Sequence, residues 1–201
     1  MRGVLKHLLP AVLQTGLACQ PRTATPVLFG PWEEGLTLAY EDPSLPQPLR
    51  SEHRLQVRVA HSDLSPGGPS LIQLDLTSIR GQMTVLLKPH AGGLDMVEAS
   101  GRVLAQVLPA HFPDTAPWAD QDTECRVLGR GAWEGAALLP PGSDPVGVWV
   151  EARSSKAPPR RTLYLPNLGE VEAREERAGT WVIVNRLVAR GFTDLPAIKH
   201  P

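Results

Sequence analysis

The sequence predicts a mainly β protein, a curved antiparallel meander or partly open barrel of about eight to ten strands with one short helix. Apolar and polar residues alternate with a period of two in many short segments, as they do in half-buried strands. Turn-forming residues separate these segments, since the 201 residues include 21 Pro and 18 Gly. Several connections are shorter than the dozen or more residues that a parallel crossover needs, so neighbouring strands should pair antiparallel.

The composition limits the class of protein. Hydrophobic residues make up 42% and charged residues 20% of the chain, which suits one folded domain. The net charge of −1 lacks the basic surplus typical of nucleic-acid-binding proteins, so no nucleic-acid partner is expected. No apolar run reaches the ~18–20 residues that a membrane-spanning helix needs.

Four strands are predicted in the first half of the chain, at residues 35–41, 52–61, 70–79 and 82–88. The second shows the pattern most clearly. Its apolar and polar residues occupy alternate positions, which a strand separates onto two faces and a helix would scatter. One set is Leu55, Val57 and Val59, and the other is Arg54, Gln56 and Arg58.

The middle of the chain is less regular. We expect a strand at 94–98 followed by the one short helix, at about 99–108, although Gly101 disfavours a helix by about 1 kcal/mol relative to Ala. Residues 109–124 read as a loop rich in Pro and Asp. A weak strand follows within 127–137, and its glycine-rich part, 129–135, reads as a hairpin turn without the spacing of a dinucleotide-binding loop.

The last third predicts four strands, at 146–153, 162–166, 170–177 and 180–190. The strand at 170–177 is strongly charged and is expected at a sheet edge. The strand at 180–190 is rich in β-branched residues and is expected in the sheet centre. The successive hairpins favour an up-and-down strand order.

The N-terminus resembles an export signal. In residues 1–19, Arg2 and Lys6 precede a mainly apolar stretch that ends in small residues before Cys19. This layout predicts a lipoprotein signal in which Cys19 is the lipidated residue. The alternative is a short N-terminal helix of a cytosolic protein. The further organisation predicted is a linker at 20–34, a single β-rich domain at 35–192 and a tail at 193–201.

Cys125 is the second cysteine, and two cysteines cannot supply a four-ligand metal site. It could pair with Cys19 if the protein is exported, or lie buried as a small hydrophobe.

No linear motif of a catalytic, metal or cofactor site is present, so no cofactor is predicted. The six histidines lie far apart in the sequence and are expected to be solvated or hydrogen-bonded. The alternating Asp120, Asp122 and Glu124 lack the glycine and distal glutamate of a calcium loop. An enzyme would need a site assembled from distant residues, for example a pocket joining His111 to Asp120 and Asp122.

Two further sets of side chains could serve binding. A basic cluster, which could meet anionic head groups, comprises Arg153, Lys156, Arg160 and Arg161. The five tryptophans could line a ligand groove. For Trp149 and Trp181, which lie in predicted strands, packing in the core is the expected role.

Residues 163–171 read LYLPNLGEV. This segment resembles the aromatic-x-P-G-[VL]-G-x-V phrase of many uncharacterised bacterial envelope proteins and lipoproteins, over roughly the last 40 residues. The resemblance implies a curved antiparallel sheet related loosely to lipoprotein-carrier folds, and it carries no catalytic residues. Asn167 stands where those families usually have Gly, and Asn tolerates the left-handed conformation that such a turn uses.

These observations predict a non-enzymatic, exported, lipoprotein-like protein of the cell envelope. Its curved sheet would bind an apolar ligand or an envelope protein, and it would meet the membrane only through its lipid anchor. A cytosolic structural or interaction protein with the same fold is the alternative, and an enzyme is a third.

Overall fold

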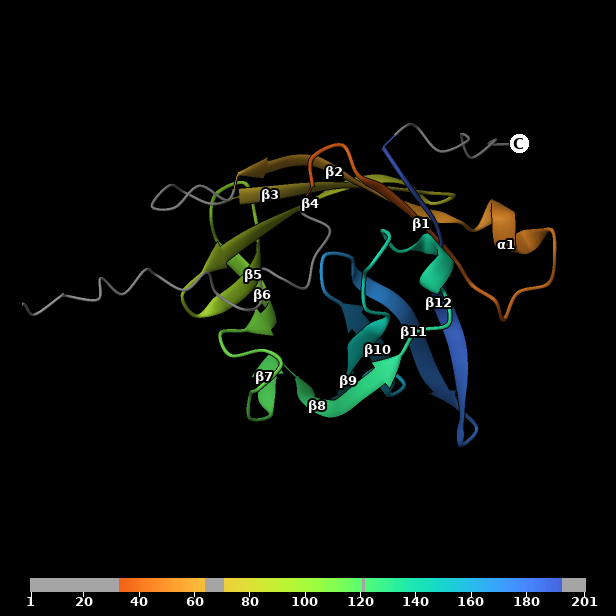
Figure 1. Cartoon of the computed structure of the whole chain (residues 1–201). Coiled ribbons are helices and arrows are strands. Elements are labelled where there is room, and N and C mark those ends of the chain that lie inside the picture. The colour runs from red at the N-terminus through yellow and green to blue at the C-terminus, as the bar shows by residue number, and fades with distance from the viewer. Residues whose placement is uncertain (1–32, 64–70, 121, 193–201) are drawn as a thin grey trace, which may run out of the picture.

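The computed structural model describes residues 33–63, 71–120 and 122–192, which form one antiparallel sheet of twelve strands (Figure 1). The strands of the first half are β1 (Thr37–Glu41), β2 (Leu55–Asp63), β3 (Leu71–Ser78), β4 (Gly81–His90), β5 (Gly93–Val97) and β6 (Val103–Pro109). Those of the second half are β7 (Trp118–Asp120), β8 (Thr123–Ala132), β9 (Val146–Ser154), β10 (Arg160–Leu165), β11 (Gly169–Arg177) and β12 (Thr180–Gly191). Two short helical segments, α1 (Leu49–Glu52) and η2 (Ala136–Leu138), lie in connections.

The strand order follows the chain, as the successive hairpins predict. The sheet runs from β6 back to β1, passes to β12, and continues back to β7. The pairing of β1 with β12, with Thr37 opposite Gly191, joins the two halves in the middle of the sheet. Figure 1 shows the sheet curving round so that its two edge strands, β6 and β7, approach each other. The predicted curved meander or partly open barrel is therefore confirmed, with twelve strands rather than eight to ten.

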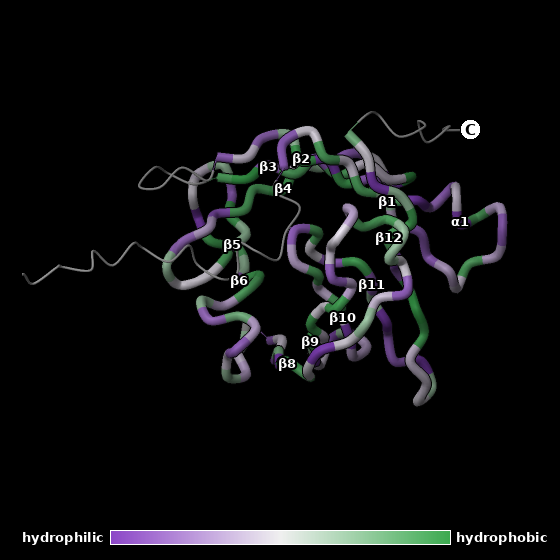
Figure 2. The backbone as a smooth tube through the Cα atoms, viewed as in Figure 1, coloured by the Kyte–Doolittle hydropathy of each residue, from purple (hydrophilic) through white to green (hydrophobic). Residues whose placement is uncertain are grey.

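In the first half of the sheet, apolar residues of neighbouring strands lie on the same face. Residues that are directly opposite on neighbouring strands share a face, and the register pairs Leu38 with Val57 and Ile72 with Leu87. Figure 2 shows apolar and polar stretches alternating along the backbone, as this arrangement requires. The largest fully buried apolar side chains are Leu36, Leu38, Val59, Ile72, Leu94, Leu108, Phe112, Leu163, Leu165, Leu168 and Val171.

The connection between β6 and β7 contributes to this core. Phe112 is fully buried, and its ring makes edge-to-face contacts with Trp118 at 6.5 Å and with Tyr164 at 6.0 Å between centroids. The predicted loop at 109–124 therefore holds a core residue and a short strand. Phe112 links the connection between the two sheet edges to β10.

The helix predicted at 99–108 is wrong, because this segment forms β6 and pairs with β5. The glycine that weakened the helix has a different role. Gly101 has φ +86°, donates its N–H to the carbonyl of Glu98 at 2.8 Å, and so makes the hairpin turn into β6. The one α-helix among the described residues lies instead between β1 and β2.

The edge position predicted for 170–177 is also wrong. This segment forms β11, which is paired on both sides, with β10 and β12. Its charged residues alternate with Val171 and Ala173, both fully buried. The charges mark one polar face of a central strand, and neighbouring strands supply their partners.

The turn between β10 and β11 confirms the expectation for Asn167, which adopts φ 61°. Trp32, Cys19, residues 1–19 and the tail at 193–201 lie outside the described residues, and so does all of the linker except Glu33 and Glu34. Within the described ranges, no helix has the length and apolar character to cross a membrane.

Candidate functional site

The polar face of β8 to β12 carries a concentration of arginines that we call the arginine face, defined by Arg126, Arg153, Arg161, Arg174 and Arg186. Register explains how they come together. Arg126 lies opposite Glu151 on β9, Glu151 lies opposite Arg161 on β10, and Arg161 lies opposite Arg174 on β11. Opposite residues share a face, so one row across four strands holds three arginines and one glutamate.

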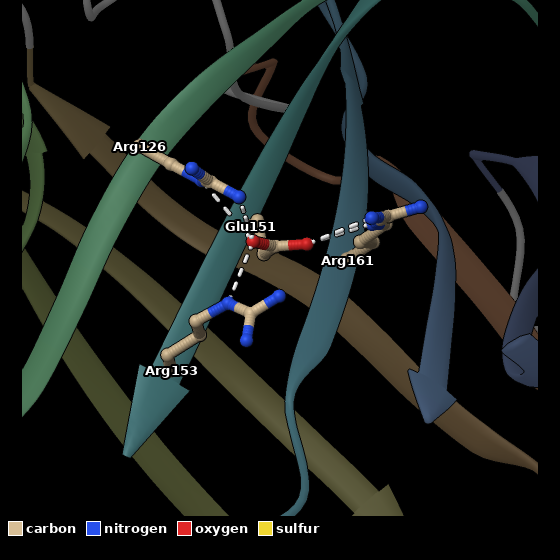
Figure 3. Close-up of polar contacts among 4 residues, drawn as sticks. All are labelled: Arg126, Glu151, Arg153 and Arg161. Atoms are coloured by element: carbon tan, nitrogen blue, oxygen red, sulfur yellow. Dashed lines mark hydrogen bonds and ion pairs between the residues drawn. The ribbon is translucent and has the colours of Figure 1, made fainter. Parts of the chain in front are cut away.

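Glu151 is the centre of this row (Figure 3). Its side chain has no exposed surface and accepts charge-assisted hydrogen bonds from three guanidinium groups. The distances to its carboxylate oxygens are 2.7 Å from Arg126 Nη2, 2.8 Å from Arg153 Nε and 2.9 Å from Arg161 Nε. Figure 3 shows the three arginines approaching the carboxylate from different sides.

These contacts fix the charge of Glu151. The hydrogen bond from Arg153 lowers its pKa most, those from Arg126 and Arg161 lower it further, and burial opposes them. The hydrogen bonds dominate, and the pKa of Glu151 falls to about 2. The carboxylate is therefore ionised at every physiological pH and holds three arginine side chains in place.

Glu172 on β11 has the same role in a neighbouring row. It is almost fully buried and accepts hydrogen bonds from Arg174 Nε at 2.7 Å and from Arg186 Nε at 3.1 Å. Five guanidinium groups thus converge on two buried carboxylates, which leaves a local excess of three positive charges. Three outlying glutamates reduce this excess at longer range, namely Glu124, Glu134 and Glu176.

Arg161 and Arg174 face each other directly on neighbouring strands, where like charges destabilise a sheet. Each is stabilised separately. Arg161 lies over the Trp181 ring at 3.9 Å from its centroid, and Arg174 lies over the Trp149 ring at 4.9 Å. The two side chains are about one-third exposed, so they remain accessible to an anion from solvent.

A depression of about 220 Å³ lies at this point of the arginine face. Its lining comprises Leu128, Gly129, Arg130, Trp149, Arg161, Arg174 and Trp181. Three guanidinium-bearing residues and two indoles therefore surround one small space. We call it the Arg–Trp pocket.

Glycines in β8 make room for this pocket. A Cβ added at Gly131 would lie 2.3 Å from Nε1 of Trp149, so the indole occupies the space that any other residue would fill. Gly129 lies opposite Trp149 at a β-bulge and has φ +131°. The prediction of a hairpin turn at 129–135 is wrong over its first residues, because β8 continues to Ala132.

Core packing is predicted for Trp149 and Trp181, and it is confirmed for Trp149 and wrong for Trp181. Trp149 packs against the core, as expected, but it also lines the Arg–Trp pocket. Trp181 lies beneath Arg161 on the polar face.

The predicted basic cluster separates into different ion pairs. Arg153 and Arg161 both bind Glu151. Lys156 Nζ lies 2.6 Å from Asp122, and Arg160 pairs with Glu170 at 3.0 Å. The linear cluster therefore contributes two members to the arginine face.

Asp120, Asp122 and His111 are the sequence-based candidates for a metal site or an assembled catalytic site. Within the described ranges, no group of three or more His, Cys, Asp or Glu side chains could hold a metal ion. Asp120 ends β7, opposite Thr123 of β8, and Asp122 pairs with Lys156. His111 is exposed in the connection between β6 and β7 and lines neither the Arg–Trp pocket nor the larger depression over β1 to β4.

Cys125 packs against the core on β8, but it is half-buried rather than buried as the alternative to a disulfide predicted. Its pairing with Cys19 stays a prediction, because Cys19 lies outside the described residues.

Comparison with known proteins gives two structural likenesses. No known family model matches the chain, and no curated protein matches it at a significant level. A crystal structure of a candidate lipoprotein from Parabacteroides distasonis aligns with a TM-score of 0.48 and 10% identity, over 82% of this chain and 98% of that one. A candidate exported protein with a YmcC-like fold from Bacteroides fragilis aligns with a TM-score of 0.47 and 12% identity, over 82% and 99%.

Proposed function

We propose that this protein is a non-enzymatic binding protein of the cell envelope that takes a small organic anion in the Arg–Trp pocket. The observation that carries the proposal is the direct opposition of Arg161 and Arg174, each stacked on a tryptophan, beside a pocket of about 220 Å³. An anion between the two guanidinium groups would relieve their repulsion and accept hydrogen bonds from both.

The ligand should be small and should carry an apolar group. Pockets for drug-sized ligands usually measure about 300–1,000 Å³, so this space suits a smaller molecule. The indole faces of Trp149 and Trp181 offer contact to a ring or a short alkyl chain. An apolar ligand without charge, as the sequence suggested, would form no ion pair with the three arginines of the lining.

The pocket supports binding rather than catalysis. Guanidinium groups remain protonated at physiological pH, and indole, leucine and glycine supply neither a nucleophile nor a proton-transfer group near pH 7. The lining therefore provides charge and shape without acid–base chemistry.

Titration calorimetry with benzoate and octanoate tests the binding proposal. Arg174→Gln removes one guanidinium group but leaves Arg186 on Glu172, so the fold should survive. Loss of a charge-assisted hydrogen bond is worth about 1.5–3 kcal/mol, which corresponds to roughly 10- to 150-fold weaker binding.

Arg177→Gln is the matched control. Arg177 lies on the same strand, is about half exposed, and pairs only with Glu175 among the residues that the structure describes. It should leave affinity unchanged. Equal affinities for the wild type and the Arg174→Gln variant, or no binding of either carboxylate, would refute the proposal.

Location at the envelope rests on residues 1–19, and the proposed anchor is a lipid on Cys19. Intact-mass spectrometry of protein from the membrane fraction should show a chain that begins at a lipidated Cys19. A soluble pool with an unmodified Met1 would instead support the cytosolic alternative.

A further inference from the structure

A second depression, of about 610 Å³, lies over β1 to β4 in the other half of the sheet. Register places a row of polar side chains across all four strands. Thr37 lies opposite Arg58, Arg58 opposite Asp75, and Asp75 opposite Thr84. We call this depression the polar trough.

A second row runs beside the first. Gln56 lies opposite Thr77, and Thr77 lies opposite Gln82. Amides and hydroxyls can each donate and accept hydrogen bonds, so these side chains can match hydroxyl groups in either role. Two parallel rows over several strands form an extended polar surface rather than a single point of contact.

The trough carries no net charge. Of its ten lining residues, only Arg58 and Asp75 are charged, and they have opposite signs. The lining of the Arg–Trp pocket, in contrast, has three arginines and no acidic residue. The two sites therefore favour different ligands, and an anion has no electrostatic reason to prefer the trough.

Asp75 is held in place within the trough. Its carboxylate accepts hydrogen bonds from Gln73 Nε2 at 3.2 Å and from Thr84 Oγ1 at 3.0 Å. Thr37 is only 5% exposed and belongs to the floor of the trough. A carboxylate with a fixed orientation can accept two hydrogen bonds from neighbouring hydroxyls of one ligand.

A bound peptide strand does not suit this surface. A peptide that adds to a sheet needs an unpaired edge, but the trough lies on a face of strands that are already paired in the ladder from β1 to β4. The ligand must be recognised through side chains alone. Neutral, hydroxyl-rich chains match the polarity and the charge of the trough.

We propose that the polar trough over β1 to β4 binds a neutral oligosaccharide. The volume of about 610 Å³ falls within the range of ordinary ligand sites. This proposal does not depend on anion binding at the Arg–Trp pocket, because the two sites use different strands.

Nuclear magnetic resonance of the full chain tests the proposal. Cellotetraose, maltotetraose and chitotetraose are titrated separately while the side-chain amide signals of Gln56, Gln73 and Gln82 are followed. At least one sugar should shift these signals in a saturable way. Because the trough and the sugar are both neutral, a tenfold rise in salt should leave the affinity unchanged, whereas it should weaken benzoate binding at the Arg–Trp pocket.

The double variant Gln56→Ala/Gln82→Ala should bind the same sugar roughly tenfold or more weakly, since two hydrogen bonds are lost. Gln47→Ala, at an exposed position in the connection between β1 and β2, is the matched control and should bind normally. Circular dichroism establishes that both variants fold. The proposal is overturned if no sugar gives saturable shifts at the trough amides, or if a folded double variant binds as tightly as the wild type.

Discussion

Replacing Glu151 by Gln tests the central ion-pair network. Gln has nearly the same shape as protonated Glu, so the variant removes the negative charge and leaves Arg126, Arg153 and Arg161 in place. The pKa of Glu151 falls from 4.5 to about 2 in the folded protein. A shift of this size corresponds to about 3 kcal/mol of stability at neutral pH.

That figure is an upper limit. Arg126 and Arg153 are about half exposed, so water screens some of the interaction even though the carboxylate itself is covered. We expect Glu151→Gln to lower the free energy of unfolding by about 2 kcal/mol at pH 7. For a domain of this size, the melting temperature should fall by roughly 4–8 °C.

The pH dependence gives a second readout. Because folding lowers this pKa, the stabilisation is complete above the unfolded-state pKa of about 4.5 and is lost as the pH falls through about 2. The difference between wild type and variant should therefore shrink between pH 4.5 and 2. Urea denaturation followed by tryptophan fluorescence measures it at each pH.

Glu98→Gln is the control, because Glu98 forms an exposed ion pair with Arg102 across the hairpin turn before β6, and exposed pairs contribute little stability. It should change stability much less than Glu151→Gln. The reasoning is refuted if Glu151→Gln is as stable as the wild type at pH 7, or if its deficit persists unchanged at pH 2.

Three further predictions concern the fold. Phe112→Ala should lower the free energy of unfolding, measured by urea denaturation, by about 3–5 kcal/mol, because removing this fully buried ring leaves a cavity beside Trp118 and Tyr164. A loss below about 1 kcal/mol would contradict the place of Phe112 in the core. Asn167→Val should lower the free energy of unfolding by about 1–2 kcal/mol, because φ 61° is unfavourable for a β-branched residue. Asn167→Gly should be tolerated. Equal stability of the two variants would argue against this turn. Burial raises the pKa of Tyr164 well above its ordinary value. In an ultraviolet titration, Tyr164 should therefore ionise only when the protein unfolds in alkali. The Tyr164→Phe variant identifies the signal of this residue.

The sequence predicts the architecture well because this sheet is built from local hairpins. Alternation at residues such as Leu55, Val57 and Val59 identifies each strand, and short turns set each pairing. Local sequence patterns predict residues 99–108 wrongly. The spacing of their apolar residues allows a helix, but pairing with β5 stabilises a strand there. The position of β11 is also predicted wrongly, because the charged residues on one face of this central strand resemble those of an edge strand.

The arginine face was harder to foresee, because its members come from five strands. Glu151 and Arg153 are two apart in the sequence, which places them on one face, but Arg126 lies 25 residues from Glu151. Pairing β8 with β9 and β9 with β10 in register would have brought Arg126 and Arg161 to Glu151. That register depends on bulges such as the one between Val127 and Gly129. In the sequence, only the glycine indicates that a bulge occurs there.

The pairing of β1 with β12 affects how the chain folds during its synthesis. During synthesis β1 emerges early, and its partner on that side follows much later, since Thr37 pairs with Gly191, 154 residues further along the chain. Until then, the main-chain N–H and C=O groups along that side of β1 remain available to other chains, which is an aggregation hazard. A circular permutant that joins the ends and opens the chain between β6 and β7 would make every strand pairing a contact between sequence neighbours, so it should fold faster than the natural order.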